Sequence, residues 1–166
     1  MKKLYIIRHA KSSWNFDLPD ENRPLALRGR RDVFRVGRVL SRTENTPDLL
    51  ITSHASRAIY TALFLADEWG YPEADIQIDE RMYHAYSNVL LDILSEIDDN
   101  INSVAIFGHN PGFTDLANHF NDTYIDNVPT CGVYGFELEI DRWEDIRDAS
   151  SQKTTMVLPK KLPRKP

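Results

Sequence analysis

The feature that most constrains this chain is a short, uninterrupted apolar run that ends in an arginine and a histidine. Residues 4–7 read LYII, a pattern that is typical of a strand buried on both faces of a sheet. Arg8 and His9 follow at once. Because ligands of open parallel α/β sheets bind outside the carboxyl ends of the strands, we expect this pair to face a ligand site.

The two side chains suit the handling of a phosphoryl group. The guanidinium of Arg8 is a planar fork of donors that matches phosphate oxygens, and a neutral His9 has a nitrogen lone pair that can attack phosphorus. The alternative is structural, with Arg8 as a salt-bridged strand end and His9 as a hydrogen-bonded bystander. A dipeptide alone does not separate the two interpretations.

Composition limits the classes of protein to consider. The 166 residues predict a single domain over residues 1–158 and a basic, proline-rich, mobile tail over residues 159–166. A net charge of −5 argues against a general nucleic-acid binder, so any anion site must be a local cluster of Arg and His. Cys131 is the only cysteine, which excludes an intrachain disulfide. No apolar stretch suits a signal peptide or a membrane span, so we expect a cytoplasmic protein.

Strand and helix patterns alternate along the rest of the chain. Helical spacing of apolar residues predicts helices over about 25–40, 56–69, 87–97 and 111–120. Short apolar runs predict strands over 49–52, 76–78 and 104–107, then a half-exposed antiparallel strand over 133–140 and an edge strand over 154–158. This order predicts a three-layer α/β/α fold with a mostly parallel central sheet.

A second arginine and a second histidine follow other predicted strands. If Ser56 caps the helix over 56–69, Arg57 lies in its first turn, where a cation is unfavourable unless an anionic ligand is present. His109 lies between the strand over 104–107 and a helix that Asn110 and Pro111 are expected to start. The sequence therefore predicts that two guanidiniums and two imidazoles converge at one edge of the sheet.

These residues resemble the motifs of the histidine phosphatase superfamily, whose fold is phosphoglycerate mutase-like. The opening motif is Arg8-His9-Ala10-Lys11-Ser12-Ser13-Trp14-Asn15, the second is Ser56-Arg57-Ala58 with Thr61-Ala62, and the late histidine lies in Gly108-His109-Asn110-Pro111-Gly112. Arg23-Pro24-Leu25 and Arg28-Gly29 are most similar to the small SixA-type phosphohistidine phosphatases. The similarity covers residues 3 to about 140.

The resemblance implies a mechanism. His9 would be the nucleophile and would become transiently phosphorylated, while Arg8, Arg57 and His109 surround the phosphoryl oxygens. Ser12 and Asn15 would help to bind the substrate, and neither a metal nor another cofactor would be required. Chemistry agrees, because phosphoryl transfer needs mainly positioning and charge neutralisation. His9 must be neutral to attack, whereas His109 would be most useful when protonated.

The general acid is where the sequence departs from the family. Many members protonate an alkoxide leaving group with a carboxylic acid, and the nearest candidate is Glu80, whose alternative is a solvated loop carboxylate. A sugar or serine alkoxide leaves poorly without a proton, whereas imidazole titrates near pH 6.5 and leaves readily once protonated. A doubtful acid therefore favours a phosphohistidine substrate.

The sequence thus predicts a metal-independent phosphatase that removes phosphate from phosphohistidine on a protein. One alternative is a phosphomonoesterase acting on a small phosphorylated metabolite. Another is a catalytically silent phosphate-binding module, which Ala10 suggests because it stands where the family motif has glycine.

Other histidines and charged residues are predicted to have structural roles. His54 is interpreted as a loop residue, and His84 and His119 as surface or packing residues. The arginines of the helix over 25–40 are interpreted as a solvated surface. Only Arg23 and Arg28 are considered for substrate contact, because they are nearest to the mouth of the first strand.

Overall fold

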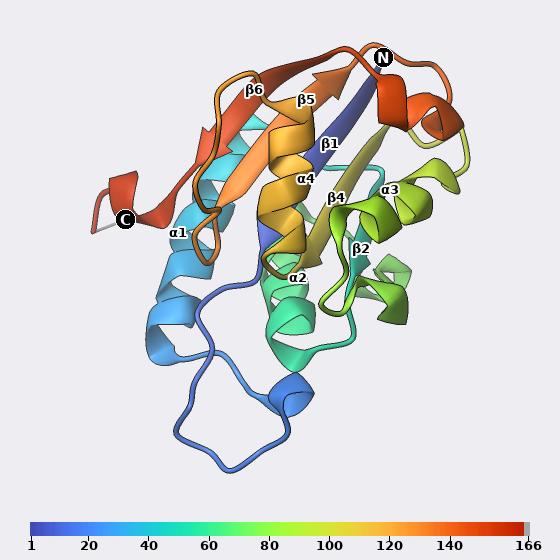
Figure 1. Ribbon diagram of the computed structural model, residues 1–166. Helices are drawn as coiled ribbons and strands as arrows, with labels where there is room; N and C mark the ends of the chain where they lie inside the picture. Colours follow the sequence, from blue (N-terminus) through green and yellow to red (C-terminus); the bar gives the residue numbers. More distant parts are fainter. Residues whose placement is uncertain (165–166) are drawn as a thin grey trace.

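The computed structural model describes residues 1–164, and its centre is a six-stranded sheet. The strands are β1 (Lys2–Arg8), β2 (Leu49–Thr52), β3 (Gln77–Ile78), β4 (Ser103–Gly108), β5 (Val133–Leu138) and β6 (Ser151–Val157). Their order across the sheet is β3-β2-β4-β1-β5-β6 (Figure 1). The first four strands in this order are parallel, whereas β5 is antiparallel to both β1 and β6. The predicted mostly parallel α/β sheet is confirmed.

The apolar runs of β1 and β4 form the middle of the protein. Alternate side chains of a strand point to opposite faces, so Leu4 and Ile6 join one buried cluster while Tyr5 and Ile7 join the other. Each of these four side chains is at most 3% exposed. Full burial of such a side chain contributes about 1.5–3 kcal/mol. The run therefore fixes β1 between two cores and places its last residues at the carboxyl edge of the sheet.

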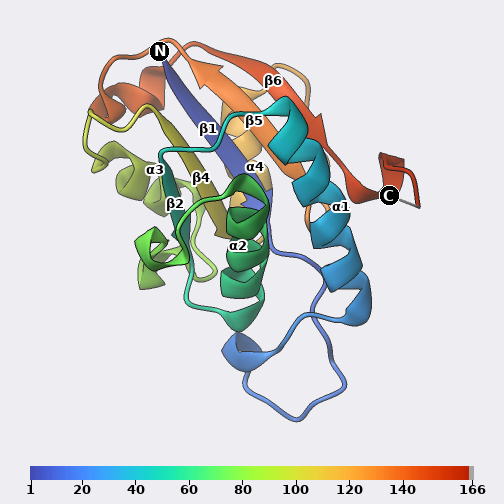
Figure 2. The ribbon, with the colours of Figure 1, turned by 180° about the vertical axis from the view of Figure 1, so that it is seen from behind.

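Helices cover both faces of the sheet, as the sequence predicts. The helices α1 (Leu27–Thr43) and α2 (Ser56–Trp69) lie on one face, and α3 (Ser87–Ser95) and α4 (Gly112–Phe120) lie on the other (Figures 1 and 2). Short 3-10 helices connect these elements: η1 (Asp20–Asn22), η2 (Glu73–Asp75), η3 (Glu80–Met82), η4 (Trp143–Asp148) and η5 (Pro159–Lys161). Over the described residues, none of the helices is both long and apolar enough to cross a membrane.

Two helix starts differ by one residue from the sequence prediction. The cap of α2 is Ala55, so Ser56 is its first helical residue, and α4 begins at Gly112 instead of Pro111. The side chain of Asn110 still ties down the first turn of α4, because its Oδ1 accepts hydrogen bonds from the Thr114 amide at 3.2 Å and the Thr114 hydroxyl at 2.9 Å. Such shifts of one residue do not move Arg57 or His109 from the carboxyl edge.

Two glycines let loops of the carboxyl edge pack closely on helices. A Cβ at Gly29, in the first turn of α1, would lie 2.2 Å from the carbonyl oxygen of Lys11. At Gly112, the first residue of α4, it would lie 1.9 Å from the carbonyl oxygen of Ala85. Any larger residue would therefore push away the segments that follow His9 and His84.

Strand β5 is more buried than its sequence predicts. The alternating pattern over residues 133–140 predicts a half-exposed strand, but β5 ends at Leu138 and, of its six residues, only Glu137 is not buried. The reason is its position, because β1 and β6 pair with its two edges and Tyr134 and Val133 enter opposite cores.

The prediction of a mobile tail over residues 159–166 is wrong for the part of it that the structure describes. Residues 159–161 form η5, Pro159 is buried and Leu162 packs against the core on the α1 side. The guanidinium of Arg35 donates to the carbonyl oxygens of Pro159 (2.9 Å), Leu162 (2.7 Å) and Pro163 (3.0 Å). Apolar burial and one multiply bonded arginine fix this segment, and residues 165–166 lie outside the described part.

Candidate active site

His9 and His109 lie side by side at the carboxyl edge because their strands are neighbours. β1 and β4 pair in register up to Arg8 and Gly108, and the His9 amide donates to the Gly108 carbonyl at 3.0 Å. The two imidazole rings are 5.2 Å apart between centroids and are inclined at 48°. Both residues are buried, His9 at 7% and His109 at 2% exposure. The structure therefore brings together the two histidines that lie 100 residues apart in the sequence.

His9 is held as a neutral imidazole with a defined tautomer. Its Nδ1 lies 2.8 Å from the carbonyl oxygen of Ala10, and because a carbonyl only accepts, Nδ1 carries the hydrogen and Nε2 keeps its lone pair. Burial lowers the pKa of His9 to about 3, assisted by the nearby charges of Arg57, Arg8 and Arg23 and opposed by the bond to Ala10. A neutral ring with a free Nε2 lone pair is the form that can act as a nucleophile.

His109 is also neutral, and a serine holds its ring in place. Its Nε2 lies 2.7 Å from the hydroxyl oxygen of Ser53, a fully buried residue after β2. A hydroxyl can donate to a ring nitrogen or accept from it, so this bond orients the ring, and Nδ1 carries the ring hydrogen when Ser53 donates. Burial lowers the pKa of His109 to about 2, assisted by repulsion from Arg57 and from any charge on His9. His109 is thus neutral, whereas the sequence suggested a protonated ring.

The two predicted arginines flank the histidine pair. Arg57, the second residue of α2, is 2% exposed, and Arg8 ends β1. One terminal nitrogen of Arg8 donates to the Val128 carbonyl at 3.0 Å. Burial, followed by repulsion from Arg57, lowers the pKa of Arg8, which indicates that the two guanidiniums share one low-dielectric environment. Two cations that repel each other favour the binding of an anion.

Several buried donors of this group have no acceptor. Among the described residues, no hydrogen-bond partner is found for the Nε atoms of Arg8 and Arg57, Nη1 of Arg23 or Nδ1 of His109. Burying an unpaired donor typically costs about 1–3 kcal/mol, so native proteins rarely leave several in one place. The three guanidinium nitrogens among them are donors that match the many acceptor lone pairs of a phosphate-like anion.

Sequence reasoning missed the carboxylate of Asp20, which lies in this group. Its Oδ2 accepts from Arg57 Nη2 at 3.0 Å, from the Tyr83 hydroxyl and from His84 Nε2 at 3.2 Å, and Oδ1 accepts from Arg23 Nε at 3.2 Å. Burial by itself would raise the pKa of Asp20, but the bonds from Tyr83, Arg57 and His84 outweigh it and hold this pKa well below its ordinary value. Asp20 is therefore an internal anion on the Arg57 guanidinium.

Tyr83 and His84 come from the loop after η3 and lie above His109. Their ring centroids are 5.4 Å and 5.0 Å from that of His109. His84 is an exposed residue, as the sequence predicts, and the structure adds that it lies beside the site. Its positive φ of 50°, unusual for a residue other than glycine, turns the loop toward the site, and no local sequence pattern signals such a turn.

Residues that the sequence placed near the mouth of the first strand also lie at the entrance to this site. The guanidinium of Arg23 lies over the exposed ring of Trp14, 3.5 Å from its centroid. His54 lies 3.0 Å from a carboxylate oxygen of Glu21, and its ring centroid is 4.9 Å from that of Tyr83. Both observations place the polar loop over residues 11–26 at the entrance.

The remaining candidates are not joined to this group by any recorded contact. Ser12 is buried and forms a bridge with Leu25, Asn15 is exposed, and Glu80 is an exposed residue of η3. Among the described residues, no hydrogen bond or ion pair of the Asn15 or Glu80 side chains is recorded. Their roles in substrate binding and proton donation stay predictions.

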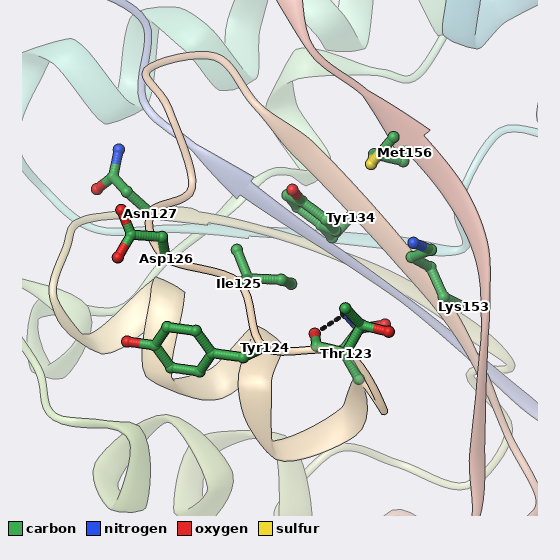
Figure 3. Close-up of a pocket in the computed structure, with 9 residues that line it drawn as sticks. Thr123, Tyr124, Ile125, Asp126, Asn127, Tyr134, Lys153 and Met156 are labelled. Carbon is green, nitrogen blue, oxygen red and sulfur yellow. Dashed lines mark hydrogen bonds between the residues drawn. The ribbon is translucent and has the colours of Figure 1, made fainter.

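A separate hollow of about 350 Å³ lies between the loop over 121–127 and the strands β5 and β6. Figure 3 shows Tyr134, Lys153 and Met156 on the strands and Thr123–Asn127 on the facing loop. None of the predicted site residues lines it, so the carboxyl edge remains the candidate active site.

Comparison with known proteins settles the family. Residues 4–100 match the sequence model of the histidine phosphatase superfamily (branch 1). The chain belongs to this superfamily. A chloroplastic protein of Arabidopsis thaliana, described as uncharacterised, is 28% identical over 153 residues, which cover 87% of this chain and 70% of that protein. Membership supports phosphatase chemistry at the site described above.

Solved structures share the fold over nearly the whole chain. A structure assigned as the phosphohistidine phosphatase SixA of Agrobacterium tumefaciens has a TM-score of 0.81 at 21% identity and covers 95% of this chain and 98% of its own. The protein histidine phosphatase SixA complexed with tungstate has a TM-score of 0.80 at 16% identity and covers 95% and 97%. A mycobacterial glucosyl-3-phosphoglycerate phosphatase has a TM-score of 0.66 at 15% identity and covers 93% and 98%. The superfamily fold therefore extends beyond residue 100.

Proposed function

We propose that this protein is a phosphatase that removes phosphate from phosphohistidine on a protein, through a phosphohistidine intermediate on His9. The observation that carries the proposal is the set of buried guanidinium donors without partners on Arg8, Arg23 and Arg57, beside the unpartnered Nδ1 of His109. A phosphoryl group in reach of His9 supplies the acceptors that these donors lack. The guanidiniums neutralise its charge, which is the main requirement of phosphoryl transfer.

The proposed reaction has two steps. First, the lone pair of His9 Nε2 attacks phosphorus, the Nε2–P bond forms, and the P–N bond of the substrate breaks. The bonding electrons pass to the leaving nitrogen of the substrate imidazole, which takes a proton from solvent. Second, water attacks phosphorus, the P–Nε2 bond breaks, and inorganic phosphate and neutral His9 result. The proton of the water passes to phosphate or solvent.

The protonation states around the site favour a leaving group that needs little acid assistance. Asp20 is ionised, because its pKa is held below the ordinary range, and an ionised carboxylate cannot donate a proton. Glu80 is exposed and has no recorded contact with the site. Imidazole leaves without a strong acid, whereas an alkoxide does not. These features support phosphohistidine over an alkyl phosphate.

A second candidate is a phosphomonoesterase for a small metabolite, which the Tyr83 hydroxyl and His84 favour. Both groups can carry a proton and lie beside His109, so they could protonate an alkoxide at the mouth. The mycobacterial phosphatase of similar fold acts on glucosyl-3-phosphoglycerate, as its name states. The two candidates differ in the leaving group alone.

A turnover panel tests the proposal. Phosphohistidine on a protein, phosphoserine, a sugar phosphate and an aryl phosphate are compared with wild type and His9→Ala. We expect phosphohistidine to be the preferred substrate, His9→Ala to lose about 10⁴-fold or more of kcat/KM, and the trapped phosphoenzyme to be acid-labile. An active His9→Ala variant contradicts the proposed nucleophile. Phosphate binding without turnover in the wild type would indicate the silent module instead.

Glu80→Gln tests whether Glu80 is the general acid of a phosphomonoesterase. We expect it to change phosphohistidine turnover by less than about twofold, because imidazole needs little acid. If alkyl phosphates are the better substrates and the variant loses that activity, the protein is a phosphomonoesterase and Glu80 is its acid. Glu96→Gln, an exposed carboxylate paired with Arg81, is the matched control.

A further inference from the structure

A row of arginines follows one side of α1. Arg28, Arg31, Arg35, Arg38 and Arg42 are spaced by three or four residues, so they lie along one stripe of the helix. At about 1.5 Å per residue, the stripe extends over about 21 Å. Asp32 is the only acidic residue within α1.

This stripe forms one wall of a hollow of about 1300 Å³, which we call the basic groove. The facing wall is the segment over residues 159–164, which lies beside α1 in both ribbon views (Figures 1 and 2). The groove is lined by the five arginines, Lys160 and Arg164, together with apolar side chains of Phe34, Val39, Pro129, Leu162 and Pro163. The bonds from Arg35 to three backbone carbonyls hold the two walls together, so the groove is formed in the folded protein.

The charge of the groove is poorly compensated within the protein. Over residues 1–164, no ion pair is recorded for any of its cations except Arg35, which pairs with Asp32. Neighbouring cations at this spacing repel, and α1 has no acidic residue in its first turn, where one would be favourable. Such conflict with local preference is expected where a surface serves a function. In a chain of net charge −5, these uncompensated arginines and lysine form a concentrated positive surface.

Backbone hydrogen bonds join the segments that carry the groove to those that carry the candidate active site. The loop after His9 leads directly into α1, where the Ala26 amide donates to the Lys11 carbonyl at 2.8 Å. Pro129 and Thr130 line the groove, and the next residue, Cys131, donates its amide hydrogen to the carbonyl of His9 at 3.0 Å. The groove and the nucleophile are therefore carried by segments that are bonded to each other.

We propose that the basic groove docks an acidic, amphipathic segment of the phosphoprotein substrate, beside the phosphohistidine that enters the active site. This inference rests on the proposed function and specifies its substrate class. The cations attract carboxylates, and the apolar side chains between them bury apolar residues of the same segment. Nucleic acid fits less well, because those apolar walls offer nothing to a phosphate backbone and the overall charge is negative.

A peptide-binding experiment tests the groove without catalysis. A fluorescein-labelled peptide of about fourteen residues, with glutamate and leucine on opposite faces, has the length of the stripe. Its binding is followed by fluorescence anisotropy with the full chain carrying His9→Ala. We expect Arg31→Glu/Arg38→Glu to weaken binding by about tenfold or more, and added salt to weaken binding to the protein with an unaltered groove.

The matched control is Arg30→Glu/Lys153→Glu, which changes the net charge equally but alters two exposed cations outside the groove lining. We expect this control to bind the peptide within about twofold of the unaltered groove. Equal loss in both variants, or equal binding of a lysine-and-leucine peptide, overturns the proposal. Binding of phosphatidylserine vesicles or duplex RNA through Arg31 and Arg38, without binding of the acidic peptide, also overturns it.

Turnover with an intact active site keeps the two proposals distinguishable. We expect Arg31→Glu/Arg38→Glu to lower kcat/KM for phosphohistidine on an acidic protein about tenfold through KM, with aryl phosphate turnover unchanged. Equal losses on both substrates overturn the docking role. If the peptide requires the groove but phosphohistidine is not hydrolysed, the docking surface stands and the proposed function fails.

Discussion

Arg57 and Arg81 both hold carboxylates, but the two clusters differ in what they leave unpaired. Arg81 is about half exposed, and all three of its guanidinium nitrogens donate to Asp79 or Glu96. Arg57 is 3% exposed in its side chain, binds Asp20, and has a buried Nε without a partner. Similar side chains thus give a satisfied surface network in one place and an incomplete buried site in the other.

The difference shows where an arginine can do chemistry. In the surface cluster, the hydrogen bonds that Arg81 donates to Glu96 and Asp79 raise its pKa, and solvent screens the charges. At the carboxyl edge, low dielectric strengthens every charge, and donors remain for another anion. We therefore expect changes around Arg57 to affect catalysis and changes around Arg81 to leave it intact.

The largest difference in activity is expected between the alanine variants of Arg57 and Arg81. Arg57→Ala should lower kcat/KM for phosphohistidine about 10³-fold, because it removes a preorganised cation from the transition state. Arg81→Ala should leave kcat/KM unchanged, since its guanidinium is occupied on the surface. Steady-state kinetics of both variants measures the contrast, and similar losses would break it.

Ser53→Ala tests whether the orientation of His109 matters. Without the hydroxyl at 2.7 Å from Nε2, the His109 ring loses the bond that orients it, so we expect kcat to fall about 30-fold with KM little changed. Ser53→Thr keeps the hydroxyl and should restore most of the activity. A loss that Thr does not rescue would indicate a packing effect.

The buried histidines should make the protein sensitive to acid. Their pKa values fall from the ordinary 6.5 to about 3 for His9 and about 2 for His109, so between pH 6.5 and 3 the unfolded chain binds more protons than the folded one. Stability should therefore decline as pH falls, by about 1.4 kcal/mol per pH unit for each histidine. Urea unfolding across this range measures it, and His9→Asn should reduce the slope. An unchanged slope would contradict the assigned neutral ring.

The smallest effect is expected on phosphate inhibition, when the carboxylate that binds each arginine is replaced by an amide. Asp20 competes with an incoming anion for Arg57, so Asp20→Asn should tighten competitive inhibition by inorganic phosphate about fivefold. Asp79→Asn, which removes a carboxylate from Arg81, should leave phosphate inhibition unchanged. Weaker inhibition in Asp20→Asn would show that Asp20 orients Arg57 for the anion instead of competing with it.

Much of the site could be predicted because its residues follow strongly patterned strands. One residue separates each of His9 and His109 from the runs LYII and VAIF, and parallel strands end at the same edge. Asp20, Tyr83 and His84 could not be predicted, because they lie on irregular loops whose paths depend on contacts such as that between Gly29 and Lys11. Their sequences resemble those of any polar loop.

The tail and the arginine row illustrate the same limit. Residues 159–164 look mobile by composition, but Arg35 reaches their carbonyls only once α1 and β6 are in place. The arginines of α1 look like a solvated helix face by spacing, but the docked segment turns them into a wall of a groove. Neither interpretation could take into account the segment that packs against each region, because that segment is more than 100 residues away in the sequence.

By itself, the sequence determined the order of strands and helices, the two buried runs beneath the site and the pairing of two histidines with two arginines. Local hydrophobic patterns carry that information, because burial of strands and helix faces depends on periodicity within a few residues. Only the tertiary structure decided the tautomer of His9, the orientation of His109, the anionic Asp20 on Arg57 and the groove along α1. These depend on single hydrogen bonds and on dielectric, which arise only when distant segments meet.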